Sequence, residues 1–149
     1  MKLETIQTGH PHVNNLSYEK NVEQIKTCAD KIEKLTGKRS VLYRGPYGEY
    51  NDVVIKAAES EKHTTIQWSL DTLDYKGLTE EEMWNRLKDK LKAGDIILMH
   101  NGTAHTADAL DKIIYNIQEK GYEIVPVSEL IYHENYTIDA NGMQKQVKN

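Results

Sequence analysis

A histidine, an arginine and two aspartates stand where short apolar runs of this sequence stop. These residues and the runs before them are His100 after 95–99, Arg44 after 41–43, and Asp71 with Asp74 after 65–69. Turn-forming or charged residues bound each run, as they bound β-strands. Proteins of the α/β class place their reactive groups at the ends of strands. We therefore expect three strands to bring these four side chains to one rim of a sheet.

Helical patterns lie between the apolar runs. Apolar residues recur at steps of three and four within 17–36, and Gly37 can adopt the left-handed conformation that ends a helix. The residues expected to cap the later helices are Asn51, Thr79 in a capping box with Glu82, and Thr106. The side chains expected on the buried helix faces are Val22, Ile25, Ala29, Ile32, Leu35, Val54, Ile55, Ala58, Met83, Leu87, Leu91, Leu110, Ile114 and Ile117.

The alternation of helix and strand predicts an α/β fold with mostly parallel strands and right-handed crossovers. A last strand is expected at 122–126 and a short helix at 127–132. The residues of 134–149 are polar and aperiodic, which indicates a tail or surface extension. The expected organisation is one α/β domain at 1–133 and a polar tail at 134–149.

The composition excludes several classes of protein. A net charge of -4 and a pI near 5.9 provide no basic field for nucleic acid. Because no stretch has the length and apolarity of a secretory signal or a membrane span, we expect a cytoplasmic protein. Cys28 is the only cysteine, so an internal disulfide is excluded. We expect Cys28 and Trp68 in the core, and His63, His105 and His133 in solvent.

Several segments together resemble one family. Three segments resemble, in order and spacing, the third, fourth and fifth motifs of the polysaccharide deacetylase family, the NodB homology domain of carbohydrate esterase family 4. These segments are 44–48 (RGPYG), 68–75 (WSLDTLDY) and 98–100 (LMH). Residues 9–12 (GHPH) resemble the end of its second motif. The resemblance implies a partial, distorted (β/α) barrel. It also implies a hydrolase that removes N-acetyl groups from chitin- or peptidoglycan-like sugars with zinc or another divalent metal. Members of the family are usually secreted or associated with the cell envelope, which differs from the cytoplasmic location expected from the sequence as written.

The resemblance also implies roles for the residues that match its motifs. His100 would be the general acid that protonates the departing amine, and Asp74 the carboxylate that orients and charges it. Arg44 stands where the family has an arginine that pairs with the catalytic base, and His10 matches a metal ligand. Tyr47 and Leu98 would form the walls of the acetyl pocket. Tyr75 is an aromatic residue in place of a tryptophan of the substrate groove.

Two departures from the family pattern limit these expectations. The first motif, an Asp-Asp strand end that carries the base and a metal ligand, has no counterpart because the sequence begins after it. In the second motif Ile6 stands four residues before His10, where the family has another histidine, and His12 is the only further imidazole nearby. Since two imidazoles without a carboxylate make a poor zinc site, we expect metal to bind weakly or not at all. Arg44 is then expected to pair with Asp71 or Asp74.

Loss of the first strand–helix units would also leave an open sheet edge. We expect this edge to be covered by a second copy, by a partner chain or by the segment 1–13. Two functions follow from the sequence. The chain is either a deacetylase that is inactive by itself, or a pseudoenzyme that binds amino-sugar polymers through Tyr47, Tyr75 and His100.

Overall fold

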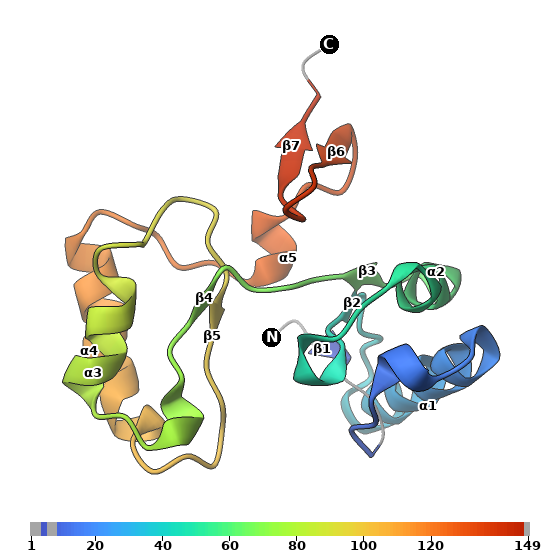
Figure 1. The fold of residues 1–149 in the computed structure, drawn as a ribbon, viewed down its shortest axis with the longest axis horizontal. Helices are drawn as coiled ribbons and strands as arrows, with labels where there is room; N and C mark the ends of the chain where they lie inside the picture. The colour runs from blue at the N-terminus through green and yellow to red at the C-terminus, as the bar shows by residue number, and fades with distance from the viewer. Residues whose placement is uncertain (1–3, 6–8, 148–149) are drawn as a thin grey trace. The chain divides into compact units, whose positions relative to one another are not determined.

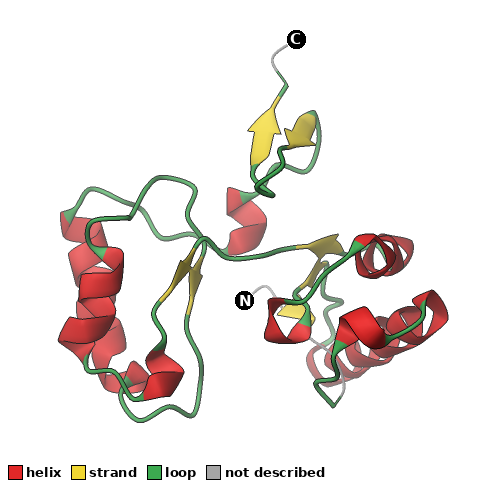
Figure 2. Ribbon diagram, in the orientation of Figure 1, coloured by secondary structure: helices red, strands yellow, loops and turns green. Residues whose placement is uncertain are grey.

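The structure is a computed structural model that describes residues 4–5 and 9–147. It divides into two compact units, Met1–Gln67 and Trp68–Asn149. Helices and short parallel strands occur in both units (Figure 1, Figure 2). The α/β class and the parallel pairing of strands are therefore confirmed.

The first unit has a three-stranded parallel sheet in the order β1-β2-β3. Its elements are β1 (Glu4–Thr5), a 3-10 turn η1 (Val13–Asn15), α1 (Tyr18–Thr36), β2 (Leu42–Tyr43), η2 (Pro46–Gly48), α2 (Asp52–Ser60) and β3 (Thr64–Thr65). In the register of the sheet, Glu4 lies opposite Leu42, which lies opposite Thr64. Of the segment 1–13, which was expected to cover a sheet edge, Glu4–Thr5 thus pairs with β2. Residues 1–3 and 6–8, Ile6 among them, lie outside the described residues.

Local signals explain where α1 begins and ends. The Ser17 hydroxyl accepts a hydrogen bond from the backbone N–H of Lys20, which caps the first turn. Gly37 adopts φ 71° after the last turn, and its N–H donates to Glu33 O at 2.8 Å. The helix therefore begins and ends close to where the sequence predicts.

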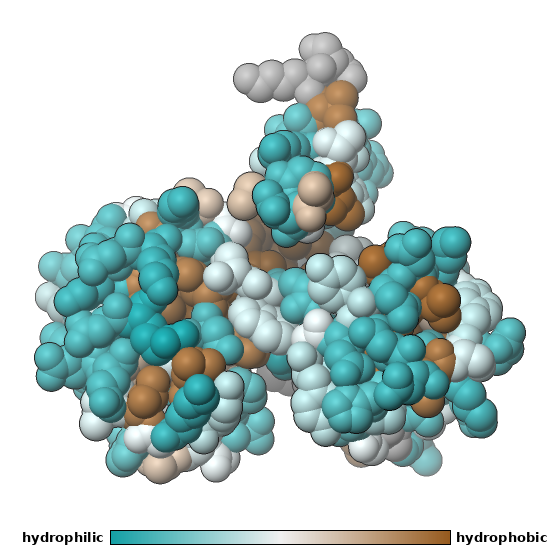
Figure 3. Space-filling model, viewed as in Figure 1, coloured by the Kyte–Doolittle hydropathy of each residue, from teal (hydrophilic) through white to brown (hydrophobic). Residues whose placement is uncertain are grey.

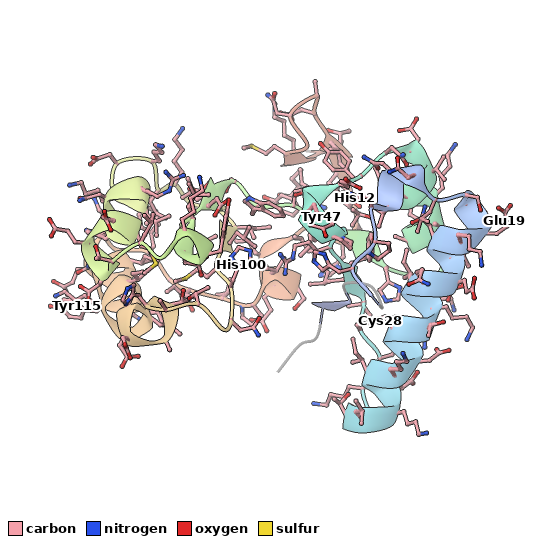
Figure 4. All side chains as sticks on the ribbon, turned by 60° about the horizontal axis from the view of Figure 1, so that its bottom comes forward. His12, Glu19, Cys28, Tyr47, His100 and Tyr115 are labelled. Atoms are coloured by element: carbon pink, nitrogen blue, oxygen red, sulfur yellow. The ribbon has the colours of Figure 1, made fainter. Side chains whose placement is uncertain are left out.

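The core of the first unit lies between α1, α2 and β2. Its buried residues are Val13, Ile25, Tyr43, Val54, Ala57 and Ala58, with Val22 packed against them. Two expectations for α1 were wrong. Leu35 is 84% exposed, because the helix continues past the end of the surface it packs on, and Cys28 is only partly buried (Figure 4).

The second unit pairs β4 (Leu70–Asp71) with β5 (Ile97–Leu98) in parallel. Its other elements are η3 (Asp74–Lys76), α3 (Glu80–Leu87), α4 (Thr106–Glu119), α5 (Val127–Leu130), β6 (Tyr136–Ile138) and β7 (Gln144–Gln146). The core lies between α3, α4 and β4 and consists of Leu70, Met83, Leu87, Ala109, Ile113 and Ile117. In Figure 3 the visible face of each unit is mostly hydrophilic, as expected when the apolar side chains are packed inside.

Three expectations for the second unit were wrong. The buried face of α4 carries Ala109 and Ile113 in place of the expected Leu110 and Ile114, of which Leu110 is exposed, whereas Ile117 is buried as expected. Residues 122–126 form no strand. The expected core residue Trp68 is only partly buried.

The apolar run at 65–69 does not form one strand. Ile66 N donates to Tyr43 O at 2.9 Å, within the first unit, whereas Ser69 N donates to Ile96 O at 3.0 Å, within the second. Between them the Gln67 side chain bonds to Gly48 O at 2.9 Å. The backbone therefore changes its pairing partner within this run, and each half belongs to a different sheet.

The segment 134–149, expected to be a polar tail, contains an antiparallel hairpin of β6 and β7. Its turn is stabilised by Asp139, whose carboxylate accepts hydrogen bonds from the N–H groups of Asn141 and Met143 and pairs with Lys145. No helix among the residues described is long and apolar enough to cross a membrane.

His63, expected in solvent, is buried at 3% exposure beside β3. Its Nδ1 lies 2.8 Å from Glu61 O, and its Nε2 lies 3.1 Å from the Ser40 hydroxyl. Burial lowers the pKa of His63; the positive charge of Arg39 also lowers it, whereas the Glu61 carbonyl and carboxylate act in the opposite direction. The folded protein therefore favours the neutral ring.

A pH dependence of stability follows from this burial. Because the pKa of His63 is lower in the folded state than in the unfolded state, the neutral ring contributes to the stability of the fold. This contribution is complete at pH values above the unfolded pKa of about 6.5 and is lost as the pH falls below that value. We expect the free energy of opening in α1 and α2, obtained from native-state hydrogen exchange after correction for the pH dependence of the intrinsic exchange rate, to fall as the pH decreases from about 7 to 5. Its slope is at most about 1.4 kcal/mol per pH unit for one proton. His63→Gln should flatten this slope, and an equal slope in the variant would contradict the assignment.

Candidate active site

The second unit brings Asp74 and His100 together. The Asp74 side chain is fully buried, and its Oδ1 lies 2.7 Å from His100 Nδ1. The backbone N–H of His100 donates to Asp74 Oδ2 at 2.6 Å. The same carboxylate thus binds both the ring and the main chain of the histidine, which determines the direction in which the ring points.

The paired strands explain this meeting. Asp71 of β4 lies opposite Leu98 of β5, so the residues just beyond both strand ends emerge at the same edge. Asp71 Oδ1 then accepts the N–H of Leu73 at 2.8 Å, in a turn that gives Leu73 a left-handed φ of 53°. This turn directs the next residue, Asp74, toward His100.

Further contacts surround the pair. Tyr75 N donates to Asp74 Oδ1 at 3.0 Å, and the Thr106 hydroxyl donates to Asp74 Oδ2 at 2.7 Å. The Tyr75 ring meets the His100 ring edge to face, with centroids 5.2 Å apart. Leu98 is buried in β5, and its carbonyl accepts from the Thr72 hydroxyl at 2.9 Å.

These contacts keep Asp74 ionised. Burial alone raises the pKa of the Asp74 carboxyl, but the hydrogen bonds from the backbone and ring of His100 and from Thr106 outweigh it, so the pKa lies below its usual value. The partner of His100 is therefore an anion that accepts the Nδ1 proton. Since the His100 side chain is 36% exposed, its ring can reach a bound molecule.

The first unit holds the other predicted group. Tyr47 is 62% exposed and has a left-handed φ of 58° at the turn after β2. The His12 ring stacks on it at 4.5 Å between centroids, and His10 meets it edge to face at 4.6 Å; His12 and Tyr47 are labelled in Figure 4. Gly45 is required in this turn, because a Cβ there would lie 2.1 Å from Glu49 O.

Glu49 was not predicted from the sequence as a member of this group. Its Oε1 lies 2.6 Å from His12 Nδ1, and its Oε2 accepts the N–H of Asn14 at 3.3 Å. The hydrogen bond from His12 lowers the pKa of the Glu49 carboxyl. Its position directly after the RGPYG segment was a usable signal, since a carboxylate beside a motif is a candidate partner for a nearby histidine.

The described residues do not fit a metal site. Among them no group of three or more His, Cys, Asp or Glu side chains could hold an ion. Both His10 and His12 contact the Tyr47 ring, and His12 Nδ1 is already engaged by Glu49. A catalytic zinc needs about three protein ligands, and the residues of 4–5 and 9–147 do not bring such a set together.

The predicted site residues thus fall into two groups. Asp74, Tyr75, Leu98 and His100 belong to the second unit, and Arg44, Tyr47, His10 and His12 to the first. Because Arg44 lies in a different unit from Asp71 and Asp74, its pairing with either stays a prediction.

Comparison with known proteins identifies the family of this chain. The polysaccharide deacetylase family profile matches residues 7–66. The peptidoglycan-N-acetylmuramic acid deacetylase PdaC of Bacillus subtilis is 34% identical over 122 residues, which are 82% of this chain and 26% of PdaC. A peptidoglycan-N-acetylglucosamine deacetylase of Bacillus cereus is 34% identical over 132 residues, which are 85% of this chain and 62% of that protein. The chain belongs to the polysaccharide deacetylase family.

A solved structure of carbohydrate esterase family 4 (CE4) supports the same assignment. A CE4 pseudoenzyme of Bacillus anthracis has a TM-score of 0.80 and 31% identity, covering 83% of this chain and 44% of its own. A mutant of that pseudoenzyme, described as having restored enzymatic activity, has the same TM-score of 0.80. The chain spans less than two thirds of each of these polysaccharide deacetylase relatives.

Proposed function

We propose that this chain carries the acid half of an N-deacetylase site of the metal-dependent CE4 type. In removal of an N-acetyl group, the amide C–N bond breaks and the leaving nitrogen needs a proton. His100 donates that proton, and Asp74 orients the ring and stabilises its charge. The observation that carries the proposal is the buried Asp74 carboxylate 2.7 Å from His100 Nδ1.

The substrate class proposed is an N-acetylated amino-sugar polymer of the peptidoglycan or chitin type. The names of the deacetylase relatives favour it. In the second unit, Tyr75, which is 56% exposed, offers an aromatic face for a sugar ring, and Leu98 is proposed as an apolar wall for the acetyl group. In the first unit, Tyr47, which is 62% exposed, offers a separate aromatic surface. We further propose that the parallel strands belong to a partial, distorted (β/α) barrel, and that a second copy or a partner chain covers its open edge.

For the 149 residues by themselves we propose binding without hydrolysis. The sequence contains no Asp-Asp pair, and the described residues contain no group of three metal-binding side chains. A nucleophilic water would therefore lack both its base and its activation. The likeness to a CE4 pseudoenzyme favours this second function, a non-catalytic sugar-binding protein.

Acetate release from N-acetylated chitooligosaccharides tests the catalytic half. We expect no release above the His100→Ala variant, with or without added zinc or cobalt. Metal-dependent release that His100→Ala abolishes would overturn the proposed inactivity while supporting the role of His100.

Binding is measured separately by NMR titration with N-acetylated and fully deacetylated oligosaccharides. We expect the N-acetylated ligand to perturb His100 and Tyr75, and Tyr75→Ala to weaken binding. Tyr115→Ala is the matched control, since Tyr115 is similarly exposed at 52% but lies on α4 (Figure 4). Equal binding of both oligosaccharides, or equal loss in both variants, would contradict a specific site.

A further inference from the structure

We propose that Thr106 is a positioning residue for the Asp74–His100 pair. The inference rests on the proposed function, in which His100 is the acid, and adds a residue to it. Thr106 is the first residue of α4, and its hydroxyl lies 2.7 Å from Asp74 Oδ2. It acts on His100 only through the carboxylate.

The carboxylate of Asp74 has its hydrogen-bonding capacity divided between its two oxygens. Oδ2 accepts from the His100 N–H at 2.6 Å and from the Thr106 hydroxyl at 2.7 Å. Oδ1 accepts from the Tyr75 N–H at 3.0 Å and faces His100 Nδ1 at 2.7 Å. Two donors therefore lie at each oxygen. Since Thr106 and a backbone N–H occupy Oδ2, the carboxylate cannot rotate without breaking bonds, and Oδ1 stays directed at the ring.

The direction of the protons along this network is determined. An ionised carboxylate can only accept, so the Thr106 hydroxyl proton points at Asp74. The oxygen of Thr106 is then free to accept from the Thr103 hydroxyl, with which it forms a short hydrogen bond. Thr103 in turn accepts the backbone N–H of Thr106 at 3.3 Å. The network thus runs from Thr103 through Thr106 to Asp74 and orients every hydroxyl toward the acid pair.

A purely structural role at the helix start does not account for the Thr106 hydroxyl. The sequence suggested that Thr106 caps α4, but the residue before the helix is His105, which makes no capping hydrogen bond, and Thr103 accepts the first-turn N–H. At the start of α3, by contrast, the Thr79 hydroxyl accepts from Glu82 N as a cap. The Thr106 hydroxyl is therefore directed to Asp74 and is not used by its own helix.

The test compares Thr106→Val with Thr106→Ser in the whole chain. The readouts are a carbon-13 titration of the Asp74 carboxyl and the downfield proton resonance of His100 Nδ1. Without the hydroxyl we expect the pKa of Asp74 to rise, because one of the hydrogen bonds that lower it is lost. We also expect loss of the Nδ1 resonance through faster exchange. Thr106→Ser should restore both.

Thr79→Val is the matched control, a helix-start threonine of the same unit whose hydroxyl bonds Glu82 of its own helix. It should destabilise α3 without moving either readout. Unchanged readouts in Thr106→Val, or equal changes in Thr79→Val, would overturn the inference.

If Thr106→Val fails to fold, the hydroxyl proton of Thr106 is observed directly in the unsubstituted protein. A proton protected from exchange with water supports the inference, and a rapidly exchanging one overturns it. None of these measurements uses a sugar, so their failure is distinguishable from failure of the proposed function.

Discussion

Asp74→Asn is expected to lower the free energy of unfolding of the Trp68–Asn149 unit by about 1–3 kcal/mol, because a partly buried donor is left unsatisfied. Each carboxylate oxygen accepts a backbone N–H, from Tyr75 at Oδ1 and from His100 at Oδ2. An amide group must place its NH2 opposite one of these N–H groups. Whichever way the amide turns, one of these two partly buried N–H groups loses its acceptor.

Tryptophan fluorescence during urea unfolding measures this effect in the right unit, since Trp68 and Trp84 are the only tryptophans and both belong to it. Asp111→Asn, at an exposed position of α4, is the control. Its free energy of unfolding should stay within about 0.5 kcal/mol of that of the unsubstituted protein. An equally small effect of Asp74→Asn would mean that water replaces the lost acceptor, and the network would then be weaker than its distances indicate.

Ile25→Ala is expected to lower the stability of the Met1–Gln67 unit by about 2–5 kcal/mol, through lost burial and the cavity left behind. Ile25 is fully buried on α1, in the cluster with Tyr43 and Val54. Leu35→Ala removes a side chain of similar size from the same helix at a position that is 84% exposed, and should cost less than about 0.5 kcal/mol.

Native-state hydrogen exchange of the amides in α1 and α2 measures both variants, because this unit has no tryptophan. The comparison distinguishes the structure from the sequence pattern, since the apolar spacing alone assigns Ile25 and Leu35 to the same buried face. Similar losses of stability in Ile25→Ala and Leu35→Ala would show that Leu35, near the end of α1, is buried against other residues.

Helix starts and ends were the most predictable features. Ser17, Gly37 and the Thr79–Glu82 capping box act through neighbours within four residues, so their chemistry is readable from the chain itself. Burial was less predictable. The stripe of α4 lies on Ala109 and Ile113, although Leu110 and Ile114 fit an apolar spacing equally well, because the surface that a helix faces depends on its neighbours.

The sequence by itself determined the family motifs, the α/β class and the pairing of His100 with an aspartate that follows the neighbouring strand, since parallel strands in register bring their ends together. The tertiary structure decided which groups complete the site. Thr106 has the residue type of a cap, yet its hydroxyl bonds Asp74, which is 32 residues away in sequence. Glu49 engages His12 at 37 residues' separation. Contacts over such distances depend on how helices and turns are placed in space, and local spacing carries no information about that placement.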